Sequence, residues 1–442
     1  MPRALLTDLY ELKMAASYLR RGMVQPATFS LFVRQLPPGR GFLVAAGLED
    51  CLSFLETFRF EQHELDYLRE VLRLDPAAID AFRELRFKGD VWAIPEGRII
   101  FANEPLLELT APLPQAQLLE TFLLNQVTVE TALASKAARV RLAARGTDLV
   151  DFSFRRTQGI EAAMMAARVS AMVGFRATSN VEAARTFGLT VSGIMAHSYV
   201  QAFPTEIEAF RAFAHDYPDE TTFLVDTYDT PTGVDRAIEV IKALHLHGRL
   251  GIRLDSGDLN VLAKRARHRL DEARLYDVRI IASGGLDEFE IAALVDAGAP
   301  IDAYGVGTKM GVSADAPSLD TVYELGAYAG RPVMKLSTGK ETLPGAKQVF
   351  RRSGFRDVIG LRDEPSPAGA EPLLQPVMRA GRRVGPPASL EAAQQRFEAD
   401  LDRLPERCRR LVVPQPMPVG LTERLLNLRE QTRAAASGKR VA

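Results

Sequence analysis

The sequence predicts an α/β protein built around a parallel (β/α) barrel. Short apolar runs recur through the middle of the chain at intervals of roughly 25 to 30 residues, which is about the length of one βα unit. Helical segments separate most of these runs, and several of the runs end in Arg, Asp, Gly or Thr. This alternation is typical of parallel strands joined by right-handed crossovers, with polar residues along one rim.

Eight short apolar runs are the candidate strands of the barrel. They are Leu149–Phe154, Ala177–Ser179, Val191–Ala196, Thr222–Val225, Gly251–Leu254, Arg279–Ala282, Ala303–Val306 and Val333–Leu336. Eight candidates without an obvious central reversal favour a closed barrel. A doubly wound open sheet is the alternative architecture.

The chain divides into three parts around this pattern: residues 1–115, the barrel at residues 116–345, and residues 346–442. The first part mixes helical and extended patterns, as an α+β layer does, and ends near the turn-rich Ala111–Pro114. The last part follows Leu343-Pro344-Gly345 and contains Arg-rich strand-like pieces and two helices. We expect it to fold back on the N-terminal layer.

The composition is that of an ordinary globular protein. The 442 residues are 47% hydrophobic and 25% charged, and the formal net charge is −1. The sequence contains no polybasic run, so nothing in it indicates nucleic acid or anionic lipid as a partner. Cys51 and Cys408 lie far apart, so neither a disulfide framework nor a thiolate zinc site is expected. The chain has no apolar run of membrane-spanning length and no apolar signal core at its start, so we expect a cytoplasmic protein.

Two arginines follow the first candidate strand, in Asp151-Phe152-Ser153-Phe154-Arg155-Arg156. Guanidinium groups bind carboxylate and phosphate oxygens through paired hydrogen bonds, so Arg155 and Arg156 are candidate anion ligands. The alternative is that both are surface charges or ion-pair partners.

Two carboxylates follow the strand Gly251–Leu254, in Asp255-Ser256-Gly257-Asp258. The intervening Gly257 lets the backbone curl around a ligand, and the carboxylates are suited to ribose hydroxyls or a magnesium ion. The structural alternative is that Asp255 or Ser256 caps the helix that begins near Leu259. Both interpretations can hold at once.

Two glycine-rich turns follow later strands, Ser283-Gly284-Gly285 and Gly305-Val306-Gly307-Thr308. Such turns expose backbone amides that bind phosphate, although a tight strand-to-helix turn also needs small residues. The second turn approaches a GxGxxG pattern, but its last glycine, Gly311, falls one residue late and the turn lies far from the start of any βαβ domain. A dinucleotide-binding fold is therefore rejected.

His197 directly follows the run Val191–Ala196, at the rim where ligands are expected. A lone histidine after a strand is more often a packing or surface residue. Its place on the ligand rim makes His197 the candidate for the central chemical role.

In their order along the chain, these segments resemble the nicotinate phosphoribosyltransferase family. The matching segments are Leu5–Tyr10, Phe154–Arg156, Gly193–Ser198, Arg253–Asp258, Gly305–Thr308 and Met334–Leu336. The resemblance runs from about Leu5 to Phe350 and implies a type II phosphoribosyltransferase. Its expected architecture is an irregular α/β barrel, an α/β sandwich built from both ends of the chain, and a homodimer with shared active sites.

The resemblance also implies an activity. Nicotinate would react with phosphoribosyl pyrophosphate to give nicotinate mononucleotide and pyrophosphate, coupled to ATP hydrolysis, in the salvage of nicotinic acid to NAD. The family histidine falls on His197, which ATP would phosphorylate. Neutral imidazole is a competent phosphoryl acceptor near pH 7.

The same resemblance implies roles for the other candidates. Tyr10 would stack on the pyridine ring, across the dimer interface, and Arg155 and Arg253 would bind the nicotinate carboxylate, with Phe154 in the same substrate-binding set. Asp255 and Asp258 would hold ribose hydroxyls or Mg²⁺. The other implied substrate ligands are Ser256, Gly257, Gly284, Gly285, Gly305, Gly307 and Thr308. The four glycines from Gly284 onward and Thr308 would hold the ribose 5-phosphate. His197, Arg253 and Asp255 form the implied catalytic group.

One departure and two alternatives accompany this interpretation. Ile194 stands where many relatives have threonine, so any hydroxyl contact there is absent or replaced. A nicotinamide-using relative would share the barrel and the histidine, but an arginine-lined pocket favours a carboxylate. A nucleotide-binding barrel without turnover is the alternative from another class, and the presence of every candidate residue argues against it.

Overall fold

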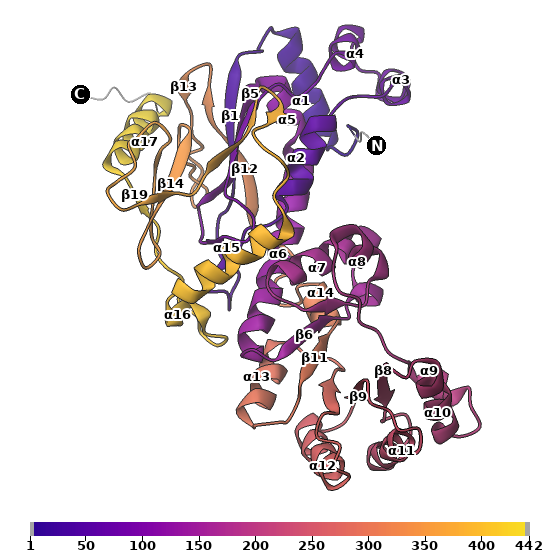
Figure 1. Cartoon of the computed structure of the whole chain (residues 1–442). Helices are drawn as coiled ribbons and strands as arrows, with labels where there is room; N and C mark the ends of the chain where they lie inside the picture. The colour runs from indigo at the N-terminus through magenta and orange to yellow at the C-terminus, as the bar shows by residue number, and fades with distance from the viewer. Residues whose placement is uncertain (1–3, 438–442) are drawn as a thin grey trace. The chain divides into compact units, whose positions relative to one another are not determined.

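The computed structural model describes residues 4–437, which fall into two compact units. Unit 1 consists of Met1–Ala132 and Ser318–Ala442, and unit 2 is Leu133–Pro317. Unit 2 is therefore one run of the chain, whereas unit 1 is assembled from both ends (Figure 1). The division falls inside helix α6 (Glu120–Ala144).

Unit 2 is built on a single parallel sheet of six strands. These strands are β6 (Asp148–Asp151), β7 (Ala177–Thr178), β8 (Glu220–Leu224), β9 (Arg249–Leu254), β10 (Arg279–Ala282) and β11 (Ala303–Val306). Their order is β7-β6-β11-β10-β9-β8, and every pair is parallel. The first strand, β6, pairs with the last, β11, so the order is circular as in a barrel. The sheet is a parallel half-barrel.

Helices connect and flank these strands. In chain order they are η1 (Phe154–Arg156, a 3₁₀ turn), α7 (Ile160–Met172), α8 (Val181–Phe187), α9 (His197–Gln201), α10 (Glu206–Asp216), α11 (Thr230–Ala243), α12 (Leu259–Glu272), α13 (Glu288–Asp296) and α14 (Thr308–Gly311). Asp229, Asp258 and Asp287 accept hydrogen bonds from backbone amides in the first turns of α11, α12 and α13. These caps start each helix shortly after the preceding strand ends, which keeps the connections at the carboxyl rim short.

Two of the eight expected strands are absent from this sheet. Val191–Ala196 contributes only a bridge between Val191 and Thr178, and among the described residues β8 pairs with β9 alone, so no strand supports the other side of this run. Val333–Leu336 belongs to unit 1, where it follows β13 (Arg331–Pro332), the antiparallel partner of β12 (Thr321–Tyr328). The expected closure into eight strands is therefore wrong. The circular strand order also excludes the doubly wound alternative.

Unit 1 combines strands from both ends of the chain. Its seven-stranded sheet has the order β13-β12-β1-β5-β3-β17-β18, its four-stranded sheet the order β16-β14-β15-β19, and β2 pairs with β4. The remaining strands of these sheets are β1 (Pro26–Val33), β2 (Leu43–Val44), β3 (Asp90–Ala93), β4 (Ile99–Ile100), β5 (Pro105–Pro112), β14 (Lys347–Arg352), β15 (Arg356–Leu361), β16 (Glu371–Pro372), β17 (Gln375–Arg379), β18 (Arg382–Arg383) and β19 (Gly420–Leu421). Because β17 pairs with β3, the expectation that the C-terminal part folds back on the N-terminal layer is confirmed.

The helices of unit 1 also come from both ends. They are α1 (Leu9–Arg20), α2 (Leu48–Thr57), α3 (Gln62–Glu70), α4 (Pro76–Arg83), α5 (Leu113–Leu118), α15 (Leu390–Arg403), α16 (Glu406–Arg409) and α17 (Glu423–Ala436). One large apolar core joins the two ends: Phe82, Val91 and Leu109 from the N-terminal part and Val349 and Met378 from the C-terminal part are fully buried in it. Unit 1 therefore depends on both termini for its stability.

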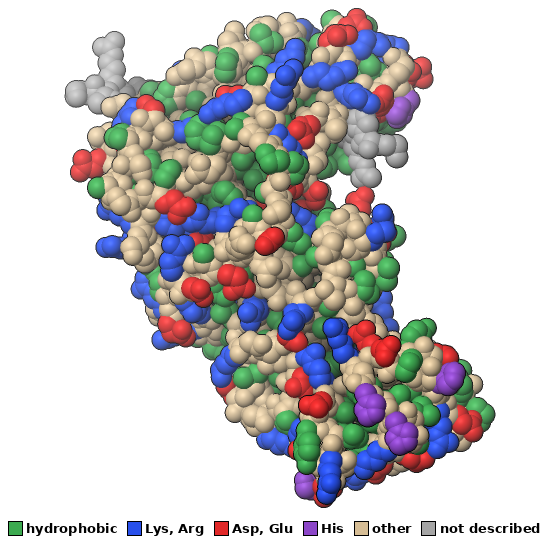
Figure 2. Space-filling view, viewed as in Figure 1, with side chains coloured by type: hydrophobic (Ala, Val, Ile, Leu, Met, Phe, Trp, Pro, Cys, Tyr) green, Lys and Arg blue, Asp and Glu red, His purple; other side chains and the backbone are tan. Residues whose placement is uncertain are grey.

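The surface reflects the balanced composition. Lys and Arg side chains are interspersed with Asp and Glu over the face shown in Figure 2. Both cysteines are free thiols and buried. Among the described residues, no helix combines the length and apolar character needed to cross a membrane.

Candidate active site

The candidate active site lies at the carboxyl ends of the parallel strands of unit 2. Because these strands all point the same way, the segments that follow them meet at one rim. The rim segments are Phe152–Arg156 after β6, Asp226–Thr227 after β8, Asp255–Asp258 after β9, Ser283–Gly285 after β10 and Gly307–Thr308 after β11. All of them belong to the same compact unit.

Arg253, Asp255 and Ser283 form one hydrogen-bonded cluster on this rim. Arg253 donates from Nε to Ser283 Oγ (2.7 Å) and from Nη2 to Asp255 Oδ1 (2.5 Å). Ser283 Oγ donates to the same Asp255 oxygen (2.5 Å). Burial opposes ionisation of Asp255, but the Ser283 hydrogen bond and the Arg253 charge outweigh it and lower the pKa of Asp255. Asp255 is therefore held as a carboxylate in a fixed orientation.

Phe152 supports the Arg253 guanidinium. The Arg253 Cζ atom lies 5.4 Å from the centroid of the Phe152 ring, within the range of a cation–π contact. A Cβ at position 305 would lie 2.4 Å from the Phe152 ring carbons, so the ring packs where only Gly305 leaves room. Phe152 was missed by the sequence analysis, although its place directly after β6 and before two arginines was an available signal.

His197 is the first residue of the short helix α9, and its imidazole faces Asp255. The distance between His197 Nε2 and Asp255 Oδ2 is 3.9 Å, and His197 Nδ1 lies 3.1 Å from Thr227 Oγ1. The side chain is 42% exposed. His197 therefore stands on the rim, as the sequence analysis expected, although an extended loop leads into it in place of a strand.

Asp226 is a second rim residue that the sequence analysis missed. Its Oδ2 atom accepts hydrogen bonds from the Asp255 backbone N–H (3.1 Å) and from Ser256 Oγ (2.5 Å). Its Oδ1 atom is buried and has no hydrogen-bond partner among the described residues. An unsatisfied carboxylate oxygen beside Asp255 is suited to a substrate hydroxyl or a cation. An acidic residue directly after the apolar run Thr222–Val225 was the available signal.

Phe154 and Arg155 lie on the 3₁₀ turn η1, because β6 ends at Asp151, earlier than expected. Asp151 fixes this turn by accepting hydrogen bonds from Ser153 N (2.9 Å) and Ser153 Oγ (2.6 Å). Phe154 is 41% exposed, and Arg155 and Arg156 are also exposed. Neither arginine side chain has a hydrogen-bond or ion-pair partner within residues 4–437. The alternative of an ion-paired structural role is thus not favoured for either.

The Asp255–Asp258 turn serves structure and site together. Asp258 caps helix α12 by accepting a hydrogen bond from Val261 N (3.1 Å), so the expected cap at Asp255 or Ser256 is wrong. Gly257 adopts φ +82, a conformation that glycine reaches without strain. The cap occupies one oxygen of the exposed Asp258, so each of Asp226, Asp255 and Asp258 uses one oxygen in structural hydrogen bonds and keeps the other for a ligand.

The two glycine-rich turns have structural requirements of their own. Gly284 has φ +97, and a Cβ there would lie 1.9 Å from the carbonyl oxygen of Asp255, so glycine allows this turn to approach the Asp255 segment. Gly285 faces open space, and Gly307 precedes α14, where Thr308 is exposed. The exposed amides and the Thr308 hydroxyl therefore remain available to an anion.

Tyr10 lies in unit 1, on helix α1, and is not part of the rim cluster of unit 2. Its hydroxyl donates a hydrogen bond to Glu120 Oε1 (3.1 Å), and its side chain is 47% exposed. Burial and the neighbouring Glu120 charge raise the pKa of Tyr10. The neutral, partly exposed ring is suited to stacking against an aromatic ligand.

The rim therefore combines four chemical capacities. An imidazole is held next to a carboxylate, two further carboxylate oxygens are free for hydroxyls or a cation, exposed guanidinium groups are free for an anion, and glycine-rich turns present backbone amides. Such a set suits the transfer of a group that carries phosphates, in which alignment and charge stabilisation dominate.

Family models match along most of the chain. The model described as the nicotinate phosphoribosyltransferase N-terminal domain matches residues 5–128, the nicotinate phosphoribosyltransferase family model matches residues 147–346, and the C-terminal domain model matches residues 360–429. The three matches follow one another without overlap.

Individual relatives are similar over nearly the full length. A Mycobacterium tuberculosis protein named nicotinate phosphoribosyltransferase pncB2 is 48% identical over 430 residues, covering 96% of this chain and 92% of the relative. The Bacillus subtilis nicotinate phosphoribosyltransferase is 42% identical over 376 residues, covering 82% of this chain and 76% of the relative. The crystal structure of human nicotinic acid phosphoribosyltransferase superimposes with a TM-score of 0.87 at 31% identity, covering 96% of this chain and 99% of that one.

Proposed function

The chain belongs to the nicotinate phosphoribosyltransferase family, and we propose that it carries out the family reaction at the rim of the unit 2 half-barrel. The protein is a nicotinate phosphoribosyltransferase, an enzyme of NAD salvage. Its substrates are nicotinate and phosphoribosyl pyrophosphate, and its products are nicotinate mononucleotide and pyrophosphate. The observation that carries the assignment to this rim is the convergence of His197, Arg253 and Asp255 in one cluster.

Arginines select the carboxylate of nicotinate. Arg253 already donates hydrogen bonds from Nε to Ser283 and from Nη2 to Asp255. The Arg155 guanidinium, by contrast, is exposed and unpaired within the described part of the chain. Arg155 is therefore the principal carboxylate ligand and Arg253 the fixed neighbouring charge. Phe154 packs beside the pyridine ring, and Tyr10 of a second subunit stacks on it, so the active form is a homodimer.

Carboxylates hold the ribose during displacement at its anomeric carbon. The bond to pyrophosphate breaks and the bond to the pyridine nitrogen forms through an oxocarbenium-like transition state. Asp255 and Asp226 accept hydrogen bonds from ribose hydroxyls and stabilise the developing positive charge. The Ser256–Asp258 turn faces the ribose, and the amides of Gly284, Gly285 and Gly307, with the Thr308 hydroxyl, hold the 5-phosphate. Gly305, also expected there, is buried within β11 under the Phe152 ring and serves the packing of the rim.

The residues present fit a magnesium ion at Asp226 and Asp255. The buried, unsatisfied Oδ1 atom of Asp226 lies on a side chain hydrogen-bonded to the Asp255 backbone, and both carboxylates are hard oxygen donors. No group of three or more His, Cys, Asp or Glu side chains suited to a metal occurs among the described residues, so substrate oxygens must complete the coordination. Asp258, the other expected ligand, caps α12 through Oδ1 and keeps Oδ2 for the ion. A bound Mg²⁺ would neutralise the leaving pyrophosphate.

His197 couples ATP to the reaction. The imidazole attacks the γ-phosphorus of ATP, the bond to the β,γ-bridging oxygen breaks, and ADP leaves. The hydrogen bond between His197 Nδ1 and Thr227 Oγ1 orients the ring before ATP arrives, and Nε2, which lies 3.9 Å from Asp255 Oδ2, is left as the attacking nitrogen. The phosphohistidine then adds negative charge beside Asp255 and reorganises the site in favour of product formation. We place this reaction in the cytoplasm.

The test is a turnover assay on the purified chain with phosphoribosyl pyrophosphate and Mg²⁺, with and without ATP. Pyrophosphate release with nicotinate should exceed that with nicotinamide by about 100-fold in kcat/KM, because nicotinamide leaves the arginines without their charge partner. Preference for nicotinamide would contradict the substrate assignment. Absence of pyrophosphate with either base would instead support a barrel that binds nucleotide without turnover.

A further inference from the structure

A cavity lies in unit 1, and its lining residues are distant in sequence from every rim residue. It has a volume of about 220 Å³ and is bounded by helix α2, by the β17–β18 hairpin with the segment that follows it, and by helix α15. Its walls are largely apolar, with Leu48, Leu52, Pro376, Val377 and Pro386 among them. The β17–β18 side is accessible, since Val384 in this lining is 48% exposed. The cavity is smaller than the roughly 300 to 1,000 Å³ of sites for drug-sized ligands, so it suits a small molecule.

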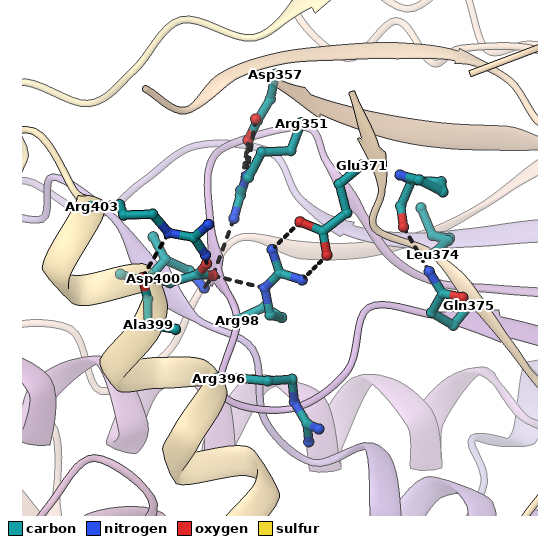
Figure 3. A network of polar contacts seen from close by, with 12 residues as sticks. Arg98, Arg351, Asp357, Glu371, Leu374, Gln375, Arg396, Ala399, Asp400 and Arg403 are labelled. Carbon is teal, nitrogen blue, oxygen red and sulfur yellow. Dashed lines mark hydrogen bonds and ion pairs between the residues drawn. The ribbon is translucent and has the colours of Figure 1, made fainter. Parts of the chain in front are cut away.

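One arginine in this cavity, Arg396, forms no direct ion pair with any described residue. Arg396 of α15 donates from Nε to the backbone oxygen of Glu96 (2.8 Å), but its buried Nη2 atom has no hydrogen-bond partner between residues 4 and 437. No carboxylate among the described residues lies within ion-pair distance of it. Figure 3 shows Arg396 pointing away from the neighbouring ionic network, in which Arg98, Arg351 and Arg403 all contact carboxylates. Glu96 and Glu49 act on Arg396 only at longer range, and burial lowers its pKa. A partly buried guanidinium without a direct ion pair is therefore suited to an anion that can contact it.

The two glutamates that line the same cavity are already engaged. Glu49 accepts from Arg383 Nη1 (2.6 Å) and from Ala388 N (3.2 Å). Glu96 accepts from Gly47 N (2.9 Å) and Leu48 N (3.0 Å), the first amides of α2. Neither carboxylate is therefore free to move onto Arg396 without breaking its existing hydrogen bonds.

We propose that this cavity is a binding site for a small monocarboxylic acid, whose carboxylate pairs with Arg396 and whose apolar body fills the space between α2 and β17. A single charge-assisted pair with one guanidinium matches a monoanion. The cavity lining carries two arginines and two glutamates, so the glutamates would repel a dianion such as phosphate more strongly than a monoanion. Phosphate also has no apolar part that could contact the leucine, valine and proline side chains. The carboxylate would be the first anion to contact Arg396, and the hydrocarbon body would displace water from the leucine, valine and proline walls.

The test is a titration in which ligand-observed NMR measures the binding of 4-methylpentanoate to the full chain. Half-saturation is expected in the millimolar range, roughly 4 kcal/mol of binding free energy for so small a ligand. Arg396→Gln should weaken binding about tenfold, and Val384→Phe, which fills the accessible side of the cavity, should weaken it similarly. The matched control is Arg382→Gln, which removes an equal charge from an exposed residue of β18 that does not line the cavity, and it should leave binding unchanged.

The outcomes separate the proposal from its alternatives. If Arg396 served only a structural purpose, Arg396→Gln would lower the melting temperature, whereas removal of an uncompensated charge should leave it unchanged or raise it. Binding of 4-methylpentanamide as tightly as the acid would overturn the proposal, as would unaltered acid binding in Arg396→Gln. Arg396-dependent binding of inorganic phosphate without binding of the acid would overturn it in favour of a phosphate site. Because binding is measured without turnover, none of these outcomes depends on the reaction at the unit 2 rim.

Discussion

Two clusters of charged residues, one in each unit, are built on opposite principles. In unit 1, Arg98 donates two hydrogen bonds to Glu371 (2.7 and 3.0 Å) and one to Asp400 (2.8 Å), and Arg351 contacts both Asp357 and Asp400 (Figure 3). On the unit 2 rim, by contrast, Arg155 and Asp226 Oδ1 have no partner within the described part of the chain, and His197 is partly exposed.

The paired charges of unit 1 stabilise the fold, whereas the unpaired charges of the rim are available to bind substrate. Asp400 is 1% exposed and joins α15 to β4 and β14, so its ionic partners connect the two ends of the chain within unit 1. The rim charges are held in place by neighbours but keep free hydrogen-bonding positions, as preorganised sites do. The rim and the unit 1 network both contain several charged residues. They differ in whether the hydrogen-bonding positions of those residues are already occupied.

The largest expected effect is loss of stability when the unit 1 network is broken. Asp400→Asn would leave Arg98 and Arg351 buried with one fewer carboxylate, and the free energy of unfolding should fall by about 3 to 5 kcal/mol. Urea unfolding followed by circular dichroism measures this change. Arg403→Gln is the control, because the Arg403 side chain is 65% exposed and its contact with Asp400 should contribute less than about 1 kcal/mol. Equal losses in both variants would contradict the comparison.

The next effect is catalytic and should leave stability intact. His197→Ala should abolish stimulation by ATP and lower kcat/KM in the presence of ATP by roughly 100-fold, while slow ATP-independent transfer persists. The melting temperature should not fall, because the imidazole makes one hydrogen bond and is partly exposed. Steady-state kinetics with and without ATP, together with a thermal melt, provide the measurement. Full ATP coupling in the variant would show that His197 is not the phosphoryl acceptor.

Periodicity predicted the parallel strands of unit 2 well, because each buried strand must be apolar and each connection must return the chain to the same rim. The same reasoning placed Asp255 at that rim, and it placed His197 there on an expected strand that did not form, whereas Arg253 was named only through the family resemblance. Periodicity failed for Val191–Ala196 and Val333–Leu336, since an apolar run becomes a strand only where a neighbouring strand accepts its hydrogen bonds. Phe152 and Asp226 were missed because their roles depend on contacts with residues far away in sequence.

Glu120 extends the comparison, because it is a unit 1 carboxylate that accepts hydrogen bonds from Tyr10 and Gln117 but has no ion-pair partner among the described residues. Burial and the nearby Glu11 charge raise the pKa of Glu120 to about 7. A carboxyl group whose pKa is raised in the folded state contributes stability that is complete below its ordinary pKa and is lost as the pH rises. The free energy of unfolding should therefore fall by about 2 kcal/mol between pH 4.5 and 7, after allowance for partial exposure.

Glu120→Gln isolates this contribution. The difference in unfolding free energy between the variant and the parent protein should change with pH over the same interval, and denaturant titrations at pH 4.5, 6 and 7.5 measure it. A difference independent of pH would show that Glu120 titrates normally and that its burial is compensated by Tyr10 and Gln117, which both donate to it.

The smallest predicted effect concerns the single hydrogen bond that orients the reactive imidazole. Thr227 Oγ1 lies 3.1 Å from His197 Nδ1, and Thr227 is held on the short segment between β8 and α11. Thr227→Val keeps the shape of the side chain and removes the hydroxyl, so ATP-stimulated kcat should fall roughly fivefold, the cost of one neutral hydrogen bond. Thr227→Ser restores the hydroxyl and should recover most of the loss, which a purely steric role would not predict. If the valine and serine variants lose activity equally, the imidazole is oriented by Asp255 alone, and the rim is less preorganised than its hydrogen bonds indicate.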